Sequence, residues 1–270
     1  MTDTVTWTEH TYKVTDGTTL HYVEMGAGTP VVLIHGAGGS AVGNWFVNGI
    51  APALAPTNRV VGIDMRGHGK SEFGPEGGLG LMHSDVIEFL DQQGIDRAHI
   101  GGYSMGGGVT LRLLASVPER FITASFGGSG IPELPAFENQ IPADKEGADP
   151  EAQAAQDAYR RRPSASGEEV GNAGRARAFA NMTEDQRAAF MRRRAEMAAA
   201  LDLSTIEFPV LAVNGEYDRP YAKTHRMWRE LPNFTNVILP GKGHLSAVMA
   251  GFIPQAYIDA MRAFITANNP

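Results

Sequence analysis

The sequence contains no cysteine. Disulfide bonds, thiolate metal ligands and a cysteine nucleophile are therefore excluded. No uninterrupted apolar run approaches about 20 residues, so no membrane-spanning helix is expected. Residues 1–7 lack a basic segment followed by an apolar run, so no secretory signal is expected and the cytoplasm is the default location.

Basic side chains are fewer than acidic ones. The chain has 23 Lys and Arg residues against 30 Asp and Glu residues, a formal net charge of −7. This balance disfavours nonspecific binding to nucleic acid or to acidic membranes, so we expect neither of them as a partner. The 270 residues, 43% of them hydrophobic, suffice for one large domain with an insertion. The oligomeric state stays open, with a homodimer as one possibility.

Short apolar segments alternate with helix-like segments along most of the chain. Residues 11–25 predict a β-hairpin with its turn at Asp16-Gly17. Continuously apolar, β-branched strands are typical of sheets covered on both faces. The pattern therefore predicts an α/β fold with a doubly wound, mostly parallel sheet. The predicted strands are 31–34, 60–63, 99–103, 121–126, 210–213 and 237–239, and the predicted helices are 79–93, 106–116, 222–230 and 254–267.

Residues 130–203 interrupt this alternation. They contain no convincing strand, whereas 151–161 and 183–201 have helix-forming compositions and 162–174 is a polar connection. Ligands of open α/β sheets bind at the C-terminal strand edge, so we expect this interval to form a helical cap there. Residues 1–129 and 204–270 would then form the core domain. A surface subdomain is the alternative.

A Gly-x-Ser-x-Gly motif stands where a strand would turn into a helix. It reads Gly102-Tyr103-Ser104-Met105-Gly106. The two glycines would remove side chains that clash with the neighbouring strand and helix, and Ser104 would occupy a strained backbone conformation. Ser104 is therefore the candidate nucleophile.

A serine nucleophile needs a base and an acid that orients the base. His244 follows the last predicted strand, and Asp218 follows the strand before it. Both loops leave the same sheet edge as Ser104, in the order serine, acid, histidine. Glu216 competes with Asp218 for the acid role, but it lies nearer the strand, and we expect it to brace the turn.

The segment His35-Gly36-Ala37-Gly38-Gly39-Ser40 directly follows the first parallel strand. Its glycines permit close backbone approach, and we expect the amides of Ala37 and Met105 to form an oxyanion hole. His35 would hold this loop by hydrogen bonding. A phosphate-binding loop is the weaker interpretation, because the Gly-Lys-Ser/Thr ending and the dinucleotide spacing are both missing.

A second glycine-rich turn, Asp64-Met65-Arg66-Gly67-His68-Gly69-Lys70-Ser71, follows the next strand. We expect Asp64 and Arg66 to brace it. A metal site that uses Asp64 and His68 is the alternative, but a third ligand at suitable spacing is missing, so no metal is expected.

Together, these motifs resemble the α/β-hydrolase superfamily, in the branch with a helical cap. The matching pieces are His35-Gly36, residues 64–71, residues 102–106, Gly215-Glu216-Tyr217-Asp218 and Gly243-His244. The resemblance implies Ser104 as nucleophile, His244 as general base and acid, and Asp218 as its orienting group. It also implies that the amides of Ala37 and Met105 form the oxyanion hole and that neither a metal nor an organic cofactor is needed.

Departures from the patterns of particular branches narrow the expected reaction to hydrolysis of a carboxylic ester or lactone. The expected partner is therefore a small-molecule substrate of that class. Epoxide- and halide-processing relatives have aspartate where this chain has Ser104. Carbon–carbon bond hydrolases commonly carry tryptophan where Leu245 stands, and proline-releasing peptidases usually show Gly-Gly-Pro-Gly where this chain reads Gly36-Ala37-Gly38-Gly39. The alternatives are a carbon–carbon bond hydrolase of a diketone or dienoate and a ligand receptor with slow turnover.

Substrate contacts are expected from residues beside these motifs. The candidates in the core are Gly36, Gly38, Trp45, Tyr103 and Leu245, and those in the cap are Met191, Met197 and Leu201. An alternative for Trp45 and its neighbour Phe46 is that they pack a core helix. The triple arginine 192–194 is expected to be a solvated face rather than an anion site.

Overall fold

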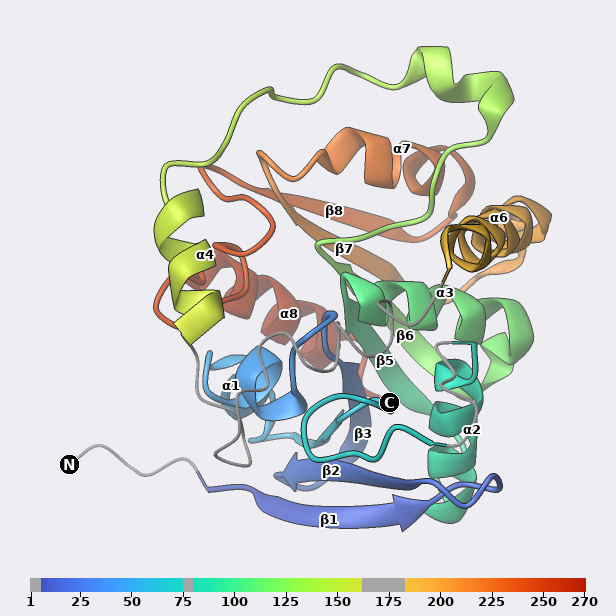
Figure 1. The fold of residues 1–270 in the computed structure, drawn as a ribbon, viewed down its shortest axis with the longest axis vertical. Helices are drawn as coiled ribbons and strands as arrows, with labels where there is room; N and C mark the ends of the chain where they lie inside the picture. The colour runs from blue at the N-terminus through green and yellow to red at the C-terminus, as the bar shows by residue number, and fades with distance from the viewer. Residues whose placement is uncertain (1–5, 75–79, 162–182) are drawn as a thin grey trace.

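A computed structural model describes residues 6–74, 80–161 and 183–270. Its centre is an eight-stranded sheet in the order β1-β2-β4-β3-β5-β6-β7-β8 (Figure 1). β2 runs antiparallel to both of its neighbours, and the pairs from β4 to β8 are parallel. The strands are β1 (Thr8–Lys13), β2 (Thr19–Met25), β3 (Thr29–Ile34), β4 (Asn58–Ile63), β5 (Ala98–Tyr103), β6 (Phe121–Gly127), β7 (Val210–Gly215) and β8 (Phe234–Leu239).

This arrangement confirms the predicted α/β fold with a mostly parallel, doubly wound sheet. The longer helices are α2 (Met82–Gln92), α3 (Met105–Ser116), α4 (Ala152–Arg161), α6 (Glu184–Ala200), α7 (Pro220–Glu230) and α8 (Gln255–Ala267). Predicted ends are displaced by a few residues, as for β8, which begins at Phe234 rather than at Val237. Two five-residue helices were not predicted: η1 (Val42–Phe46) and α1 (Ile50–Leu54). Glycine and proline in these short segments weaken the helical signal.

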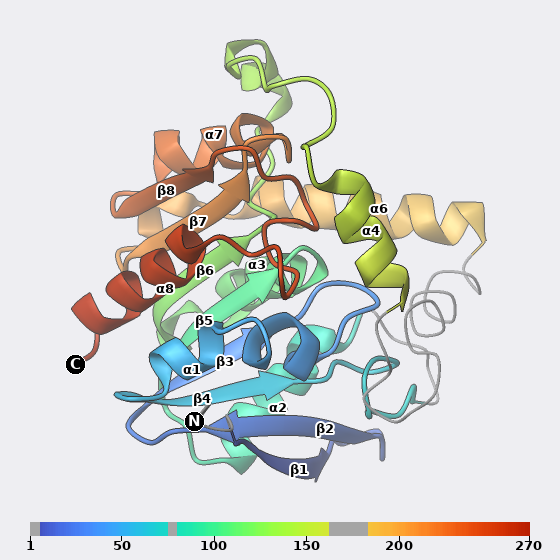
Figure 2. The same ribbon diagram turned by 90° about the vertical axis from the view of Figure 1, so that its left-hand side faces the viewer.

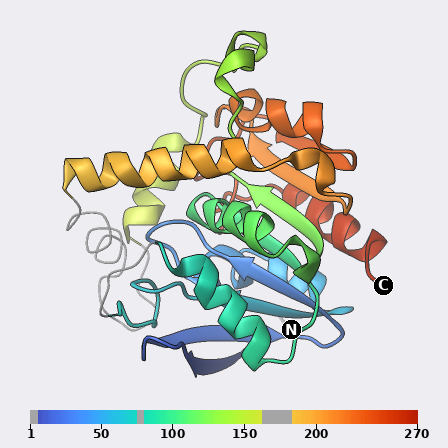
Figure 3. The same cartoon turned by 90° about the vertical axis from the view of Figure 1, so that its right-hand side faces the viewer.

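Helices cover both faces of the sheet. α1 and α8 pack together on one face, where buried side chains of β3 such as Val31 and Leu33 meet them (Figure 2). α2, α3 and α6 cover the other face (Figure 3), where Val32 and Ile34 of the same strand join the larger hydrophobic cluster. Successive side chains of one strand thus enter different cores, which explains why the predicted strands are apolar throughout.

The two helices predicted between residues 130 and 203 are α4 and α6. They take different positions: α4 lies beside the loop after β3, whereas α6 packs against α3 and buries Ala198 in the core. The polar connection predicted at 162–174 lies outside the described residues. The division into a core domain and a cap stays a prediction. Among the described helices, none is long and apolar enough to cross a membrane.

Candidate active site

The turn between β5 and α3 holds Ser104 in a strained conformation. Its φ is 52° and its ψ is −105°, a backbone state that L residues rarely adopt. A Cβ atom on Gly102 would lie 2.2 Å from the backbone of Gly106, and one on Gly106 would lie 2.2 Å from the carbonyl oxygen of Ile34. Only glycine therefore fits on either side of the serine, as the motif indicated.

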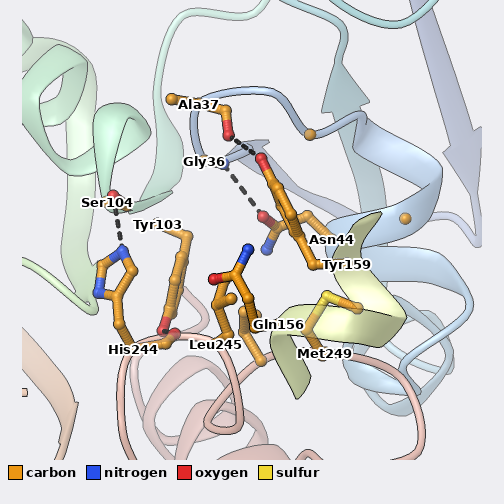
Figure 4. Close-up of a pocket in the computed structure, with 13 residues that line it drawn as sticks. Gly36, Ala37, Asn44, Tyr103, Ser104, Gln156, Tyr159, His244, Leu245 and Met249 are labelled. Carbon is orange, nitrogen blue, oxygen red and sulfur yellow. Dashed lines mark hydrogen bonds between the residues drawn. The ribbon is translucent and has the colours of Figure 1, made fainter. Parts of the chain in front are cut away.

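Two later loops bring His244 and Asp218 to this serine. His244 Nε2 lies 2.9 Å from Ser104 Oγ (Figure 4). On the other side of the ring, His244 Nδ1 lies 2.8 Å from Asp218 Oδ2. A carboxylate can only accept, so Nδ1 carries the proton and Nε2 accepts from the serine hydroxyl. The structure thus joins the three predicted side chains in one hydrogen-bonded chain.

Glu216 has a different set of partners. Its Oε2 accepts from the Gly241 amide at 2.9 Å, and its Oε1 pairs with Lys145 Nζ at 3.0 Å. These two hydrogen bonds lower the pKa of the Glu216 carboxyl. The contacts tie the loop after β7 to the loop after β8, which is the bracing role expected for this residue.

Tyr103 supports the histidine loop. Its hydroxyl donates to the main-chain carbonyl of His244, and only 2% of the residue is exposed. Burial raises the pKa of this phenol well above its usual value. Cβ atoms on Gly127 and Gly128 would lie 2.7 and 2.6 Å from its side-chain atoms, so the ring fills the space against this backbone. Tyr103 lines the cavity, and its hydroxyl is occupied by the hydrogen bond to His244.

The loop after β3 is fixed on both sides. His35 Nδ1 donates to the Gly36 carbonyl at 2.8 Å, and its Nε2 accepts from the Met65 amide at 3.0 Å. Asn44 Oδ1 accepts from the Gly36 amide at 3.0 Å. Ala37 lines the cavity beside Ser104, and the Met105 amide is the first of α3, so it has no partner within that helix. The oxyanion-hole role of these two amides stays a prediction.

A cavity of about 300 Å³ opens over Ser104 and His244. Of the predicted contact residues, Gly36, Tyr103 and Leu245 line it. Trp45 does not, because its side chain is 1% exposed within the cluster that packs α1 and α8, as the alternative interpretation held. Gly38 is also absent from the described lining: it supplies a turn residue with φ of 68°, and Gly39 lines the cavity instead.

The cap residues suggested by the sequence do not supply the described lining. Leu201 packs against the larger core cluster, and Met197 is not among the described lining residues. The side chain of Met191 lies outside the described set. The reason is the position of α6, which packs against α3 and not beside the cavity.

Several lining residues were missed by sequence reasoning. They are Asn44, Gln156, Tyr159, Val248 and Met249. Gln156 and Tyr159 are spaced i, i+3 on α4, and that spacing places them on one helix face. Tyr159 donates its hydroxyl to the Ala37 carbonyl at 2.8 Å (Figure 4). The spacing was visible in the sequence, but nothing there showed which face of α4 meets the core.

The turn after β4 is braced as expected. Asp64 accepts from the Ala41 amide at 2.7 Å, from the Lys70 amide at 2.9 Å and from His21 Nδ1 at 2.9 Å. Burial would raise the pKa of Asp64, but its hydrogen bonds, that from His21 foremost, lower it on balance. Arg66 forms an ion pair with Asp85 at 2.5 Å. Asp64 therefore links the turn after β4 to β2 and to the start of the segment before η1.

The chain belongs to the alpha/beta hydrolase family, whose model matches residues 31–253. It is 40% identical to the dihydrolipoyllysine-residue acetyltransferase component of the acetoin cleaving system of Pseudomonas putida over 112 residues. This segment is 40% of this chain and 30% of that protein. It is 39% identical over 146 residues to the 2-hydroxy-6-oxononadienedioate/2-hydroxy-6-oxononatrienedioate hydrolase of Paraburkholderia phymatum, 49% of this chain and 50% of the relative. Esterase YbfF of Escherichia coli is 37% identical over 92 residues, 34% of this chain and 35% of that protein.

The matched segments span half or less of these relatives. Among solved structures, a putative lipase from Acinetobacter baumannii AYE aligns with a TM-score of 0.71 and 22% identity, over 97% of this chain and 91% of the other. That likeness shows the fold.

Proposed function

We propose that the protein is a serine hydrolase that cleaves a carboxylic ester or lactone through an acyl-enzyme intermediate. The observation that carries the proposal is the chain of hydrogen bonds from Ser104 Oγ to His244 Nε2 and from His244 Nδ1 to Asp218 Oδ2, at 2.9 and 2.8 Å. This connectivity is what a serine needs to become a nucleophile. The strained turn presents its hydroxyl at the N-terminus of α3, where developing negative charge is favoured.

In the first half-reaction, Ser104 Oγ attacks the carbonyl carbon while His244 takes the hydroxyl proton. The carbonyl oxygen becomes an oxyanion and accepts hydrogen bonds from the amides of Ala37 and Met105. The tetrahedral intermediate collapses, and His244 returns the proton to the departing alcohol. In the second half-reaction, His244 deprotonates a water that attacks the acyl carbon. The bond from that carbon to Ser104 Oγ then breaks, His244 returns the proton to Ser104, and the acid is released.

The lining of the cavity favours a small to medium substrate. Its volume is about 300 Å³, at the lower end of the range for ligand pockets. Leu245, Val248 and Met249 supply an apolar wall, while Gln156 and Tyr159 supply polar groups from α4. An acyl group of modest length would lie against the apolar wall.

Carbon–carbon bond hydrolysis of a dienoate is the second candidate. It is favoured by the similarity to the Paraburkholderia phymatum hydrolase, the longest of the three matched segments. Against it stands Leu245 at the position where such enzymes commonly carry tryptophan. The same Ser104 and His244 would serve either reaction, so substrates must decide between them.

The test is a substrate panel of simple esters, lactones and vinylogous diketones, run with the wild-type protein and with Ser104→Ala. We expect the ester or lactone to turn over fastest, and Ser104→Ala to lose about 10⁶-fold in turnover. Faster turnover of the diketones would favour the second candidate. Substantial ester turnover by Ser104→Ala would refute the serine mechanism.

A further inference from the structure

Asp218 has a second partner besides His244. Its Oδ2 faces the histidine, and its Oδ1 lies 2.5 Å from the ammonium of Lys223. The side chains of Lys223 and Asp218 are 24% and 11% exposed, so solvent reaches this pair only in part. One carboxylate is therefore shared between a fixed cation and the imidazole.

The local fold places Lys223 at this position. Arg219, between Asp218 and α7, has a left-handed backbone with φ of 51°, which is rare for a side-chain-bearing residue. This residue turns the chain sharply, so the first turn of α7 returns beside Asp218, and the Lys223 amide donates to the Arg219 carbonyl at 3.3 Å. Gly130 packs directly on the Lys223 backbone, because a Cβ there would lie 2.1 Å from its carbonyl oxygen.

Three other titratable groups lie near this ion pair: Asp144, Arg219 and Tyr103. Asp144, from the segment before α4, accepts from the Tyr221 and Ala222 amides at the start of α7 at 2.8 and 3.1 Å. Burial lowers the pKa of Lys223, while Asp218 and Asp144 raise it and Arg219 lowers it further. Tyr103 is the remaining titratable group whose electrostatic interaction with Asp218 is described. Among these groups, two bond directly to the Asp218 carboxylate. The Lys223 ammonium contacts Oδ1, and the His244 imidazole contacts Oδ2.

We propose that Lys223 is a positioning residue that holds the Asp218 carboxylate toward His244 and, by sharing its negative charge, keeps His244 available as a base at lower pH. The inference rests on the proposed function. Protonating His244 places a second positive charge on the other side of the same carboxylate. The two like charges, on Lys223 and on His244, repel each other. Removing the Lys223 charge should therefore make protonation of the histidine easier.

The experiment measures kcat/KM for a chromogenic ester against pH in four variants. Lys223→Met removes the charge and the donor, Lys223→Gln keeps an amide donor without charge, and Lys223→Arg keeps the charge. Lys70→Met removes another lysine with a carboxylate partner, Glu9, remote from His244 in the chain. We expect the acidic limb to move up by roughly one pH unit in the two neutral variants. It should stay near the wild-type position in Lys223→Arg and in Lys70→Met.

A merely structural role for Lys223 would lower activity at every pH without moving the limb. Circular dichroism and thermal unfolding identify folded variants, and Lys223→Gln supplies the comparison if Lys223→Met does not fold. An unmoved limb in a folded neutral variant, or an equal movement in Lys70→Met, overturns the inference. Ser104→Ala separates this failure from that of the proposed function: if it abolishes turnover while the limb stays fixed, only the role of Lys223 is wrong.

Discussion

At the scale of single residues, the site depends on which acid meets His244. Asp218 and Glu216 stand two positions apart on one loop, yet their carboxylates point to different partners. Asp218 contacts His244 and Lys223, whereas Glu216 contacts Gly241 and Lys145. Two chemically similar side chains therefore have separable roles.

This separation gives a matched pair of variants. Asp218→Asn keeps the shape of the side chain but turns the acceptor facing His244 Nδ1 into an amide, so kcat should fall by about 10⁴. Glu216→Gln loses an exposed ion pair with Lys145 and keeps an acceptor for Gly241, so kcat should fall by less than about tenfold. Steady-state kinetics on one ester measures both. Equal losses would mean that the acid has been assigned wrongly.

At the scale of elements, α4 is connected to the proposed oxyanion loop. The Tyr159 hydroxyl donates to the Ala37 carbonyl, and the Asn44 side chain holds the Gly36 amide from the other side. The loop thus has one restraint from η1 in the core and one from α4. A helix outside the central sheet can therefore influence where the Ala37 amide lies.

Tyr159→Phe tests this connection. It removes the hydroxyl and keeps the ring, so one hydrogen bond of about 1 kcal/mol is lost and kcat/KM should fall by roughly fivefold. Tyr221→Phe is the control, because Tyr221 is 37% exposed on α7 and is not among the described lining residues. If the two variants behave alike, α4 does not position the loop.

At the scale of the whole molecule, Asp64 ties the turn after β4 to β2 and to the segment before η1. Its pKa is lowered in the folded protein, although burial opposes this. A carboxyl whose folded pKa lies below its unfolded value of about 3.9 stabilises the fold above that pH and loses this contribution as the pH falls through the folded pKa.

We therefore expect Asp64→Asn to lower the free energy of unfolding at pH 7 by about 2 kcal/mol or more, because one of the two oxygens that accept from buried N–H groups becomes an NH2 group, which cannot accept. The difference from wild type should shrink below about pH 4. Asp259→Asn, at an exposed ion pair on α8, should change stability by less than about 0.5 kcal/mol. Urea unfolding at pH 7, 5 and 3 measures both. A constant difference across this range would contradict the assignment.

Much of the fold and the proposed triad could be predicted from the sequence. Apolar strands, glycine turns and the chain order of Ser104, Asp218 and His244 are local signals, and parallel strands bring their loops to one edge. The direction of Trp45 could not be predicted. Asn44 and Trp45 are neighbours in the short helix η1, and consecutive helical residues point in different directions, so one faces the cavity and the other the core.

Contacts between distant segments were also beyond the sequence. Tyr159 meets Ala37 across 122 positions. Lys223 is close to Asp218 in the chain, but their ion pair depends on the left-handed backbone at Arg219. Glycine is the usual sequence signal for such a backbone, and position 219 is an arginine. Such contacts follow from packing of whole elements, which single-residue patterns do not determine.

The most direct test of the account is covalent labelling with a fluorophosphonate, followed by peptide mass spectrometry. We predict one adduct, on Ser104, which disappears in Ser104→Ala and persists in Ser116→Ala, an exposed serine of α3. His244→Ala should slow the labelling, because the base that accepts the serine proton is lost. No adduct, or an adduct on another residue that persists in Ser104→Ala, would contradict the central claim that Ser104 is the nucleophile.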